Sequence, residues 1–262
     1  MPTDLISLIS PKNLILFIII FTRLSGMMTT MPLMAHYPIP MQAKTWFMAV
    51  VAFVMFPVIL AKTGFQIPTS VPELLIVLLK EFLIGYTVGF ISNIIFISVE
   101  ISANLISMQM GLTAAQAMDP ITGDSSPILT QAYTIIAGFI FIGINGYQWI
   151  FSAIFKTFQV IPPGYGIFID GNTTHNIIYM TSQIFTIGIG IALPIFAVLL
   201  ITDVLLGFTA KMMPKMNIFM VALPVKIYLG LSLLIILTPQ ITSRIGLLME
   251  KHLPSIITIL GG

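Results

Sequence analysis

The sequence predicts an all-α membrane protein built from long, broken helices and helical hairpins. Of its 262 residues, 57% are hydrophobic and only 8% are charged, and the mean hydropathy is +1.05. A soluble core cannot enclose so large an apolar fraction, so the apolar segments must face lipid or other protein. Prolines and polar clusters divide these segments, which predicts breaks and turns between helices.

The charge balance and the rare residue types exclude several classes of function. The formal net charge is only +2 and the basic residues are scattered, so no basic face for nucleic acid is expected. The chain has no cysteine, which excludes disulfides, thiolate metal sites and cysteine nucleophiles. His36, His175 and His252 lie far apart, without a second ligand at helical spacing. Because phosphate-binding glycine loops and serine nucleophile motifs are also missing, we expect no metal, no cofactor and no enzyme.

The first three apolar segments predict three helices. Residues 12–34 predict one helix with Arg23 near its middle, where a guanidinium facing lipid would be costly. Arg23 must therefore be paired or point into protein, which favours a helix buried in an assembly. A second apolar run ends near Leu60, and a third helix is predicted over residues 73–104.

Two glycines mark one face of that third helix. Gly85 and Gly89 are four residues apart in KEFLIGYTVGF, so both lie on the same side of a helix. Another helix can approach closely where side chains are absent. We interpret Gly85 and Gly89 as packing positions and not as a binding site, because glycine is common in membrane helices.

The second half of the chain predicts further long apolar helices. Residues 128–158 contain a long run without charge, which is long enough to span a membrane. Residues 170–176 predict a polar loop, and residues 177–208 predict a helix with a kink at Pro194. The last segment, residues 241–260, predicts a separate terminal amphipathic helix that is cut by Pro254.

The stretch 106–127, ISMQMGLTAAQAMDPITGDSSP, interrupts the apolar pattern near the middle of the chain. Unbranched thioethers can fill an irregular gap and then yield, and small residues free the backbone. A proline also pushes the residue before it towards an extended conformation. This composition predicts a reversible seal, with an ordinary connector between helices as the alternative. The candidate residues of the seal are Met108, Met110, Gly111, Ala114, Ala115, Met118, Asp119 and Pro120.

A tight turn is predicted between two antiparallel helices near residue 214. The turn residues are Lys211, Pro214, Lys215 and Asn217. Asp203 lies eleven positions before Pro214 and Lys226 lies twelve after it, so the two sit at nearly the same height on the two helices. Because each charge is costly in an apolar setting, we predict that they form a buried pair. A contact of Lys226 with a neighbouring subunit is the alternative.

A secondary transporter is another class that these charges allow. Asp203, Lys226 and Glu100, together with the helix break at Pro194, are the kind of features that line ion pathways. The sequence shows no internal half-repeat, which a transporter of this type usually has.

Four segments resemble one family. KEFLIGYTVGF, LISMQMGLTAAQAMDPITG, SPILTQ and PKMNIFMVALPVKIYLG are similar to the export-gate family of FliR and its injectisome counterpart SctT. The similarity runs over residues 23–237. Its most specific parts are residues 111–120 and the turn at residues 214–217, which Pro224-Val225-Lys226 follow.

The resemblance implies a subunit of a type III protein-export gate in the bacterial inner membrane, at the flagellar basal body. Such a subunit completes a helical ring with FliP-like and FliQ-like subunits, meets FlhB and FlhA, and passes unfolded protein through its centre. The family's central loop plugs the pore, which matches residues 106–127. Residues 1–176 would form a FliP-like part, and residues 177–262 a FliQ-like hairpin with a terminal helix. The segment PKMNIFMVALPVK favours the flagellar over the injectisome branch.

Overall fold

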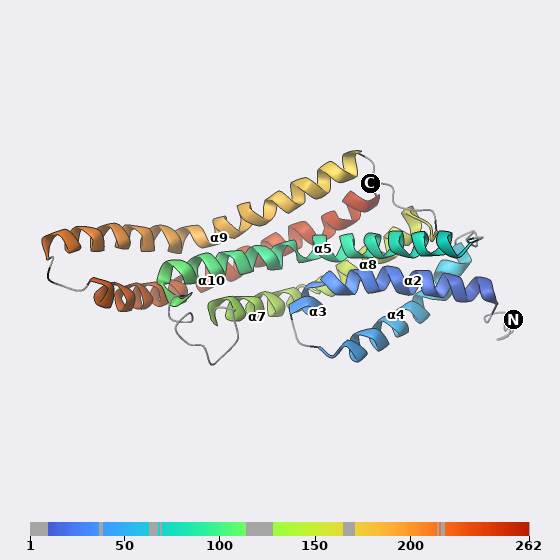
Figure 1. Cartoon of the computed structure of the whole chain (residues 1–262), viewed down its shortest axis with the longest axis horizontal. Coiled ribbons are helices and arrows are strands. Elements are labelled where there is room, and N and C mark those ends of the chain that lie inside the picture. The colour runs from blue at the N-terminus through green and yellow to red at the C-terminus, as the bar shows by residue number, and fades with distance from the viewer. Residues whose placement is uncertain are drawn as a thin grey trace. The chain divides into compact units, whose positions relative to one another are not determined.

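The computed structural model describes residues 10–36, 39–62, 68, 70–113, 128–164, 171–213, 215 and 218–261. Every regular element among these residues is a helix, as Figure 1 shows, so the predicted all-α fold is confirmed. In chain order the helices are α2 (Pro11–Thr30), α3 (Pro32–His36), α4 (Met41–Lys62), α5 (Val71–Met110), α7 (Ile128–Gly143), α8 (Gly146–Val160), α9 (Gly171–Met212) and α10 (Ile218–Gly261).

Five of the described helices, α2, α4, α5, α9 and α10, are long and apolar enough to cross a membrane. A sixth span is counted if α7 and α8, which a short break separates, are taken together. One span needs about 20 residues. With 42 and 44 residues, α9 and α10 are longer than one span requires. The chain is therefore a membrane protein with unusually long helices.

The chain forms two compact units that interleave along the sequence. The first contains Met1–Asn93, Asn145–Thr181 and Glu250–Gly262, and the second contains Ile94–Ile144 and Ser182–Met249. These two units are defined by which residues lie close together in space. The predicted division at residue 176 into a FliP-like and a FliQ-like part rests instead on resemblance to a family, and it stays a prediction.

Helix α2 carries one largely buried face in the first unit. The Ser10 hydroxyl caps it by accepting a hydrogen bond from the Asn13 N–H, and Pro11 occupies the first position, where a missing N–H costs no helical bond. Phe17 meets Phe56 of α4 edge to face, with ring centroids 6.3 Å apart. The buried apolar side chains of α2 include Leu16, Ile19, Ile20, Leu24 and Met27.

Helices α2 and α5 approach each other at glycines. A Cβ on Gly85 would lie 1.8 Å from the carbonyl oxygen of Arg23, and a Cβ on Gly89 would lie 2.4 Å from that of Met27. Gly26 makes the reciprocal approach from α2 to α5. The carbonyl groups named here belong to the backbone and cannot rotate away, although at Gly89 the side-chain hydroxyl of Thr30 also crowds the added Cβ, so this contact requires glycine. The two glycines predicted to lie on a packing face thus both meet α2.

In the second unit, α7, α9 and α10 pack on the carboxyl-terminal part of α5. Phe96 of α5 meets Phe141 of α7 edge to face, with ring centroids 5.7 Å apart. On α9, a Cβ at Gly188 would lie 2.9 Å from the Ser98 carbonyl oxygen of α5. This part of α5 is therefore the support on which the later helices are placed.

The first and third helices differ from their predicted lengths. The first ends at Thr30 and not near residue 34, because Pro32 biases Met31 towards an extended conformation, with φ −58° and ψ 132°. The third extends to Met110 and not to about residue 104. Small and apolar residues continue the helix until Gly111, whose positive φ ends it.

The second half of the chain differs in three places. The predicted run 128–158 is two helices, because Asn145 adopts a left-handed conformation (φ 55°) between α7 and α8. Residues 171–176, predicted as part of a polar loop, are the first turns of α9. The predicted terminal helix is neither separate nor cut at Pro254, because α10 continues through both Pro239 and Pro254. Around Pro239, the hydroxyls of Thr238 and Thr242 donate to helix carbonyls, which helps an apolar helix to continue.

Candidate functional site: the end of α5 and its hairpin support

The predicted seal begins inside a helix. Residues 106–110 form the last turns of α5, and Gly111 (φ 78°) closes them by donating its N–H to the Met108 carbonyl at 3.1 Å. Met108, Met110 and Gly111 are thus placed by the structure. A sealing role for the stretch as a whole stays a prediction, because five of its candidate residues lie outside the described residues: Ala114, Ala115, Met118, Asp119 and Pro120.

The chain returns to α5 after this stretch. Helix α7 begins at Ile128, and the Thr130 hydroxyl donates a hydrogen bond to Oδ1 of Asn104 on α5 at 2.8 Å. Thr130 is buried at this contact. The chain therefore leaves α5 at Gly111 and is bonded to α5 again through Thr130, just after the predicted seal.

The two described methionines of the stretch have different surroundings. Met108 is 65% exposed, whereas Met110 is fully buried. Met110 fills the notch that Gly230 leaves on α10, where a Cβ would lie 2.7 Å from the Cγ, Sδ and Cε atoms of Met110. A flexible thioether suits such an irregular notch. Met110 therefore attaches the end of α5 to α10, and Met108 presents its thioether outside the chain.

Asp203 of α9 and Lys226 of α10 form an ion pair. The side chain of Asp203 is 39% exposed and that of Lys226 is 18% exposed. Within this chain the pair is therefore half-buried, whereas the sequence predicted a buried pair. Its neighbours Val204 and Leu205 are also exposed, so the pair lies at the margin of the contact between the two helices.

Gln109 joins this ion pair to α5. Its Nε2 donates a hydrogen bond to Oδ2 of Asp203 at 2.7 Å, while Oδ1 of Asp203 meets Lys226. Each oxygen of the carboxylate thus has its own partner. Gln109 is not among the residues predicted from the sequence. The signal was present, because a glutamine between two methionines is a polar side chain at the end of an otherwise apolar helix, and such a group needs a partner.

The predicted turn falls between α9 and α10. Lys211 lies in the last turn of α9, where a cation complements the helix dipole, and it is exposed, as is Lys215. Pro214 and Asn217 lie outside the described residues. The ends of the two helices, at Met212 and Ile218, agree with a hairpin turn at this position.

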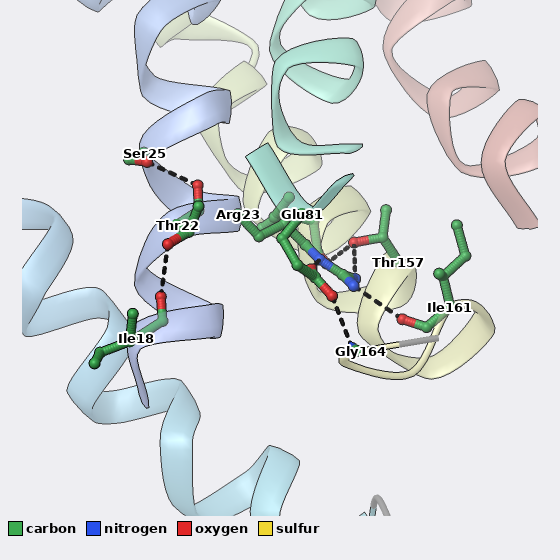
Figure 2. A network of polar contacts seen from close by, with 9 residues as sticks. Ile18, Thr22, Arg23, Ser25, Glu81, Thr157, Ile161 and Gly164 are labelled. Atoms are coloured by element: carbon green, nitrogen blue, oxygen red, sulfur yellow. Dashed lines mark hydrogen bonds and ion pairs between the residues drawn. The ribbon is translucent and has the colours of Figure 1, made fainter. Parts of the chain in front are cut away.

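A second polar cluster lies in the first unit, around Arg23 and Glu81. Figure 2 shows the two side chains pointing toward each other from α2 and α5. Nε of Arg23 donates to Oε2 of Glu81 at 2.5 Å, Nη1 donates to the Thr157 hydroxyl at 3.2 Å, and Nη2 donates to the Ile161 carbonyl at 3.1 Å. The N–H of Gly164 donates to Oε1 of Glu81 at 2.9 Å. One ion pair therefore holds α2, α5 and the end of α8 together.

Burial explains why this pair needs so many partners. Arg23 is 0% exposed and Glu81 is 1% exposed, and the guanidinium carbon lies 4.1 Å from the ring centroid of Phe158. Buried charges are tolerated when they are paired and fully hydrogen-bonded. The prediction that Arg23 is paired or points into protein is confirmed. Arg23 gives no reason to expect that an assembly buries this helix, because the partners of Arg23 belong to its own chain.

The side chains at and beside the end of α5 can make apolar, ionic and hydrogen-bonding contacts. Met108 offers a soft apolar surface, Asp203 and Lys226 offer an ion pair, and Gln109 offers an amide hydrogen bond. In the part of the chain that the structure describes, no three histidine or acidic side chains gather in a way that could hold a metal ion.

Comparison with known proteins places the whole arrangement in a family. The family described as bacterial export proteins, family 1, matches residues 14–252. The flagellar biosynthetic protein FliR of Bacillus subtilis (strain 168) is 28% identical over 225 residues, which cover 84% of this chain and 85% of that protein. The FliR of Escherichia coli (strain K12) is 28% identical over 84% of this chain and 82% of its own length, and the FliR of Aquifex aeolicus (strain VF5) is 26% identical over 89% of each. Because the family match extends over nearly all described helices, the chain belongs to the bacterial export proteins, family 1.

Proposed function

We propose that this chain is the FliR-like subunit of the type III protein-export gate of the bacterial flagellum. The observation that carries the proposal is the family match over residues 14–252, which includes the end of α5 and most of the α9 and α10 hairpin. The relatives compared above are flagellar biosynthetic proteins, and the matches cover 82% to 89% of their lengths. With its apolar helices, the chain is a flagellar export component of the inner membrane.

Within the gate, residues 106–127 act as the plug of the pore through which unfolded flagellar proteins pass. The described residues support this role in two ways. The segment starts within α5, and Thr130, shortly after its last residue, is bonded to Asn104 of α5, so the chain leaves and rejoins one helix. The exposed thioether of Met108 can make a soft contact that yields to a passing chain, whereas Met110 is occupied inside the chain.

FliP-like and FliQ-like subunits cover the outer faces of the helices, and FlhB and FlhA are further partners. Support comes from the surface of the hairpin, where large apolar side chains lie beside a half-exposed ion pair. Lipid would solvate the apolar groups but not the charges, so a protein surface is the better cover for this face. The exposed apolar side chains of the hairpin include Phe208, Met212, Tyr228, Ile235 and Ile236.

The experiment is to delete the gene copy of this chain in its own host and restore it with an affinity tag. Restored motility, together with a purified particle that contains the FliP-like and FliQ-like proteins, is the expected result. Expressed alone, the chain should aggregate or be degraded, because half-exposed charges on apolar helices are left uncovered.

Two outcomes would point elsewhere. A stable monomer that moves ions by itself would contradict the gate and favour a secondary transporter. Normal motility in the deleted strain, with loss of secretion through an injectisome, would instead assign the chain to the virulence-type counterpart SctT.

A further inference from the structure

Gln109 and Met110, the last two residues of α5, and Gly111 directly after them each lie against the hairpin of α9 and α10. Gln109 donates to Asp203, which is paired with Lys226. Met110 fills the notch at Gly230, and a Cβ on Gly111 would lie 2.8 Å from Cδ1 of Leu223. The attachment thus has a polar part at Gln109 and an apolar part at Met110.

We propose that Gln109 is a positioning residue of the gate, which holds the end of α5 on the hairpin and is itself held by the ion pair of Asp203 and Lys226. This inference rests on the proposed function, because its consequence is that the hairpin sets the position from which the plug starts. Asp203 shares its two oxygens between Gln109 and Lys226. Any movement of Lys226 therefore changes the acceptor on which Gln109 depends.

The two parts of the attachment differ in how they can be released. Met110 is fully buried and fits a notch that only glycine leaves, so it keeps its place as long as the helices are packed. Asp203 is 39% exposed, so a neighbouring subunit or a passing chain can reach the polar part. A hydrogen bond to a charged acceptor stabilises the attached helix end, yet it can still break and let the donor bind another acceptor. The hydrogen bond between Gln109 and Asp203 is therefore the part of the attachment that can be released.

The first experiment removes the polar part and leaves the apolar part. In purified particles containing the partner subunits, Gln109→Leu should raise ion leakage through the closed gate. Loss of a hydrogen bond to a charged group shifts the ratio of attached to detached helix ends by about 10- to 100-fold. Gln148→Leu on α8 is the matched control, because this exposed glutamine lies in the first unit, and it should leave leakage at the wild-type level.

A second variant separates positioning from simple packing. Gln109→Glu alone should leak, because it places a second carboxylate against Asp203. Combined with Asp203→Asn, it should close the gate again, since one amide, one carboxylate and Lys226 are then all still present. A packing defect would not be repaired by this exchange.

A reversible tether tests the same idea directly, because the chain has no cysteine of its own. A Cβ at residue 230 would lie 2.7 Å from Cγ of Met110, so Met110→Cys with Gly230→Cys brings the two Cβ atoms near the roughly 3.5–4.5 Å that a disulfide needs. In the Gln109→Leu background, oxidation should abolish the leak and reduction should restore it.

The outcomes separate this inference from the proposed function. If wild-type particles assemble and export but Gln109→Leu does not leak, the positioning role is overturned and the gate stands. If Gln109→Leu leaks but neither the exchange variant nor the oxidised tether closes it, the leak has another cause and the positioning role is again overturned. If the wild-type chain forms no particle with FliP-like and FliQ-like partners, the proposed function itself fails.

Discussion

Arg244 of α10 donates a hydrogen bond from Nη1 to the carbonyl oxygen of Gly190 on α9, at 3.0 Å. Gly190 lies four residues before Pro194, and proline has no N–H to give that carbonyl its usual helical partner. Gly190 also leaves space for the guanidinium, since a Cβ there would lie 3.1 Å from Nη2 of Arg244. Arg244 therefore replaces the hydrogen bond that Pro194 removes, as side chains commonly do at prolines in membrane helices.

This relationship predicts a specific suppressor. Arg244→Ala should lower the stability of the hairpin by about 1–2 kcal/mol, because it leaves the Gly190 carbonyl without a partner. Pro194→Ala should relieve most of that loss by restoring the N–H within α9. Thermal unfolding of the purified complex, carrying each single change and the double change, measures both effects. A double variant no more stable than Arg244→Ala would show that Arg244 has a different role.

The cluster around Arg23 predicts an asymmetry between single and double substitutions. Arg23→Met should cost about 3–5 kcal/mol, because it leaves the Glu81 carboxylate buried without its cation. Arg23→Met combined with Glu81→Leu should cost less, although the N–H of Gly164 then loses its acceptor. The yield and melting temperature of the assembled complex compare the three variants. If the double change costs as much as the sum of the single ones, the two residues do not stabilise each other.

A glycine in the contact between α2 and α5 should respond to alanine substitution differently from a glycine with free space around it. Gly85→Ala should destabilise the chain by about 1–3 kcal/mol, because its methyl group would overlap the backbone of Arg23. Gly207→Ala on α9 is the control: no atom lies within 4 Å of its added Cβ, and alanine favours a helix by up to about 1 kcal/mol. Equal melting temperatures for the two variants would contradict the close approach.

The ion pair on the hairpin predicts rescue by charge exchange. Asp203→Lys or Lys226→Asp alone should cost about 1–3 kcal/mol, between the values for exposed and buried pairs, because the pair is half-buried. The double exchange should recover most of the loss, since the amide of Gln109 can offer its oxygen in place of its nitrogen. Complex assembly and motility provide the readout. A double variant no better than the worse single one would mean that Lys226 acts at a subunit contact.

The sequence predicts most of the fold because apolar segments and turn residues act locally. The long helices and the hairpin near residue 214 follow from hydropathy and from the spacing of prolines. The pairing of Asp203 with Lys226 follows from the rise of a helix, since both lie at the same distance from one turn. Helix ends were harder to predict. At Asn145 a left-handed residue breaks an apolar run, and at Pro239 side-chain hydroxyls help the helix to continue.

The partners of single polar residues could not be predicted in the same way. Arg23 had to be paired, but its contacts with Thr157 and Ile161 join positions more than 130 residues apart. No local pattern encodes such a contact. Gln109 is similar, because its acceptor on α9 is 94 residues away. The extent to which Asp203 is exposed depends on how the hairpin helices pack, which their spacing alone does not determine.

In the proposed gate, residues 106–127 close the pore. The measurement that tests this closure most directly is ion conductance of the assembled complex after deletion of residues 111–117, with the Met108→Ala and Met118→Ala double variant as a second test that leaves Met110 in its notch at Gly230. We expect both to conduct above the wild-type level while the complex purifies intact, because the seal loses its small residues or its thioethers. Background conductance from intact particles of both variants would contradict the claim and make this stretch a connector between helices.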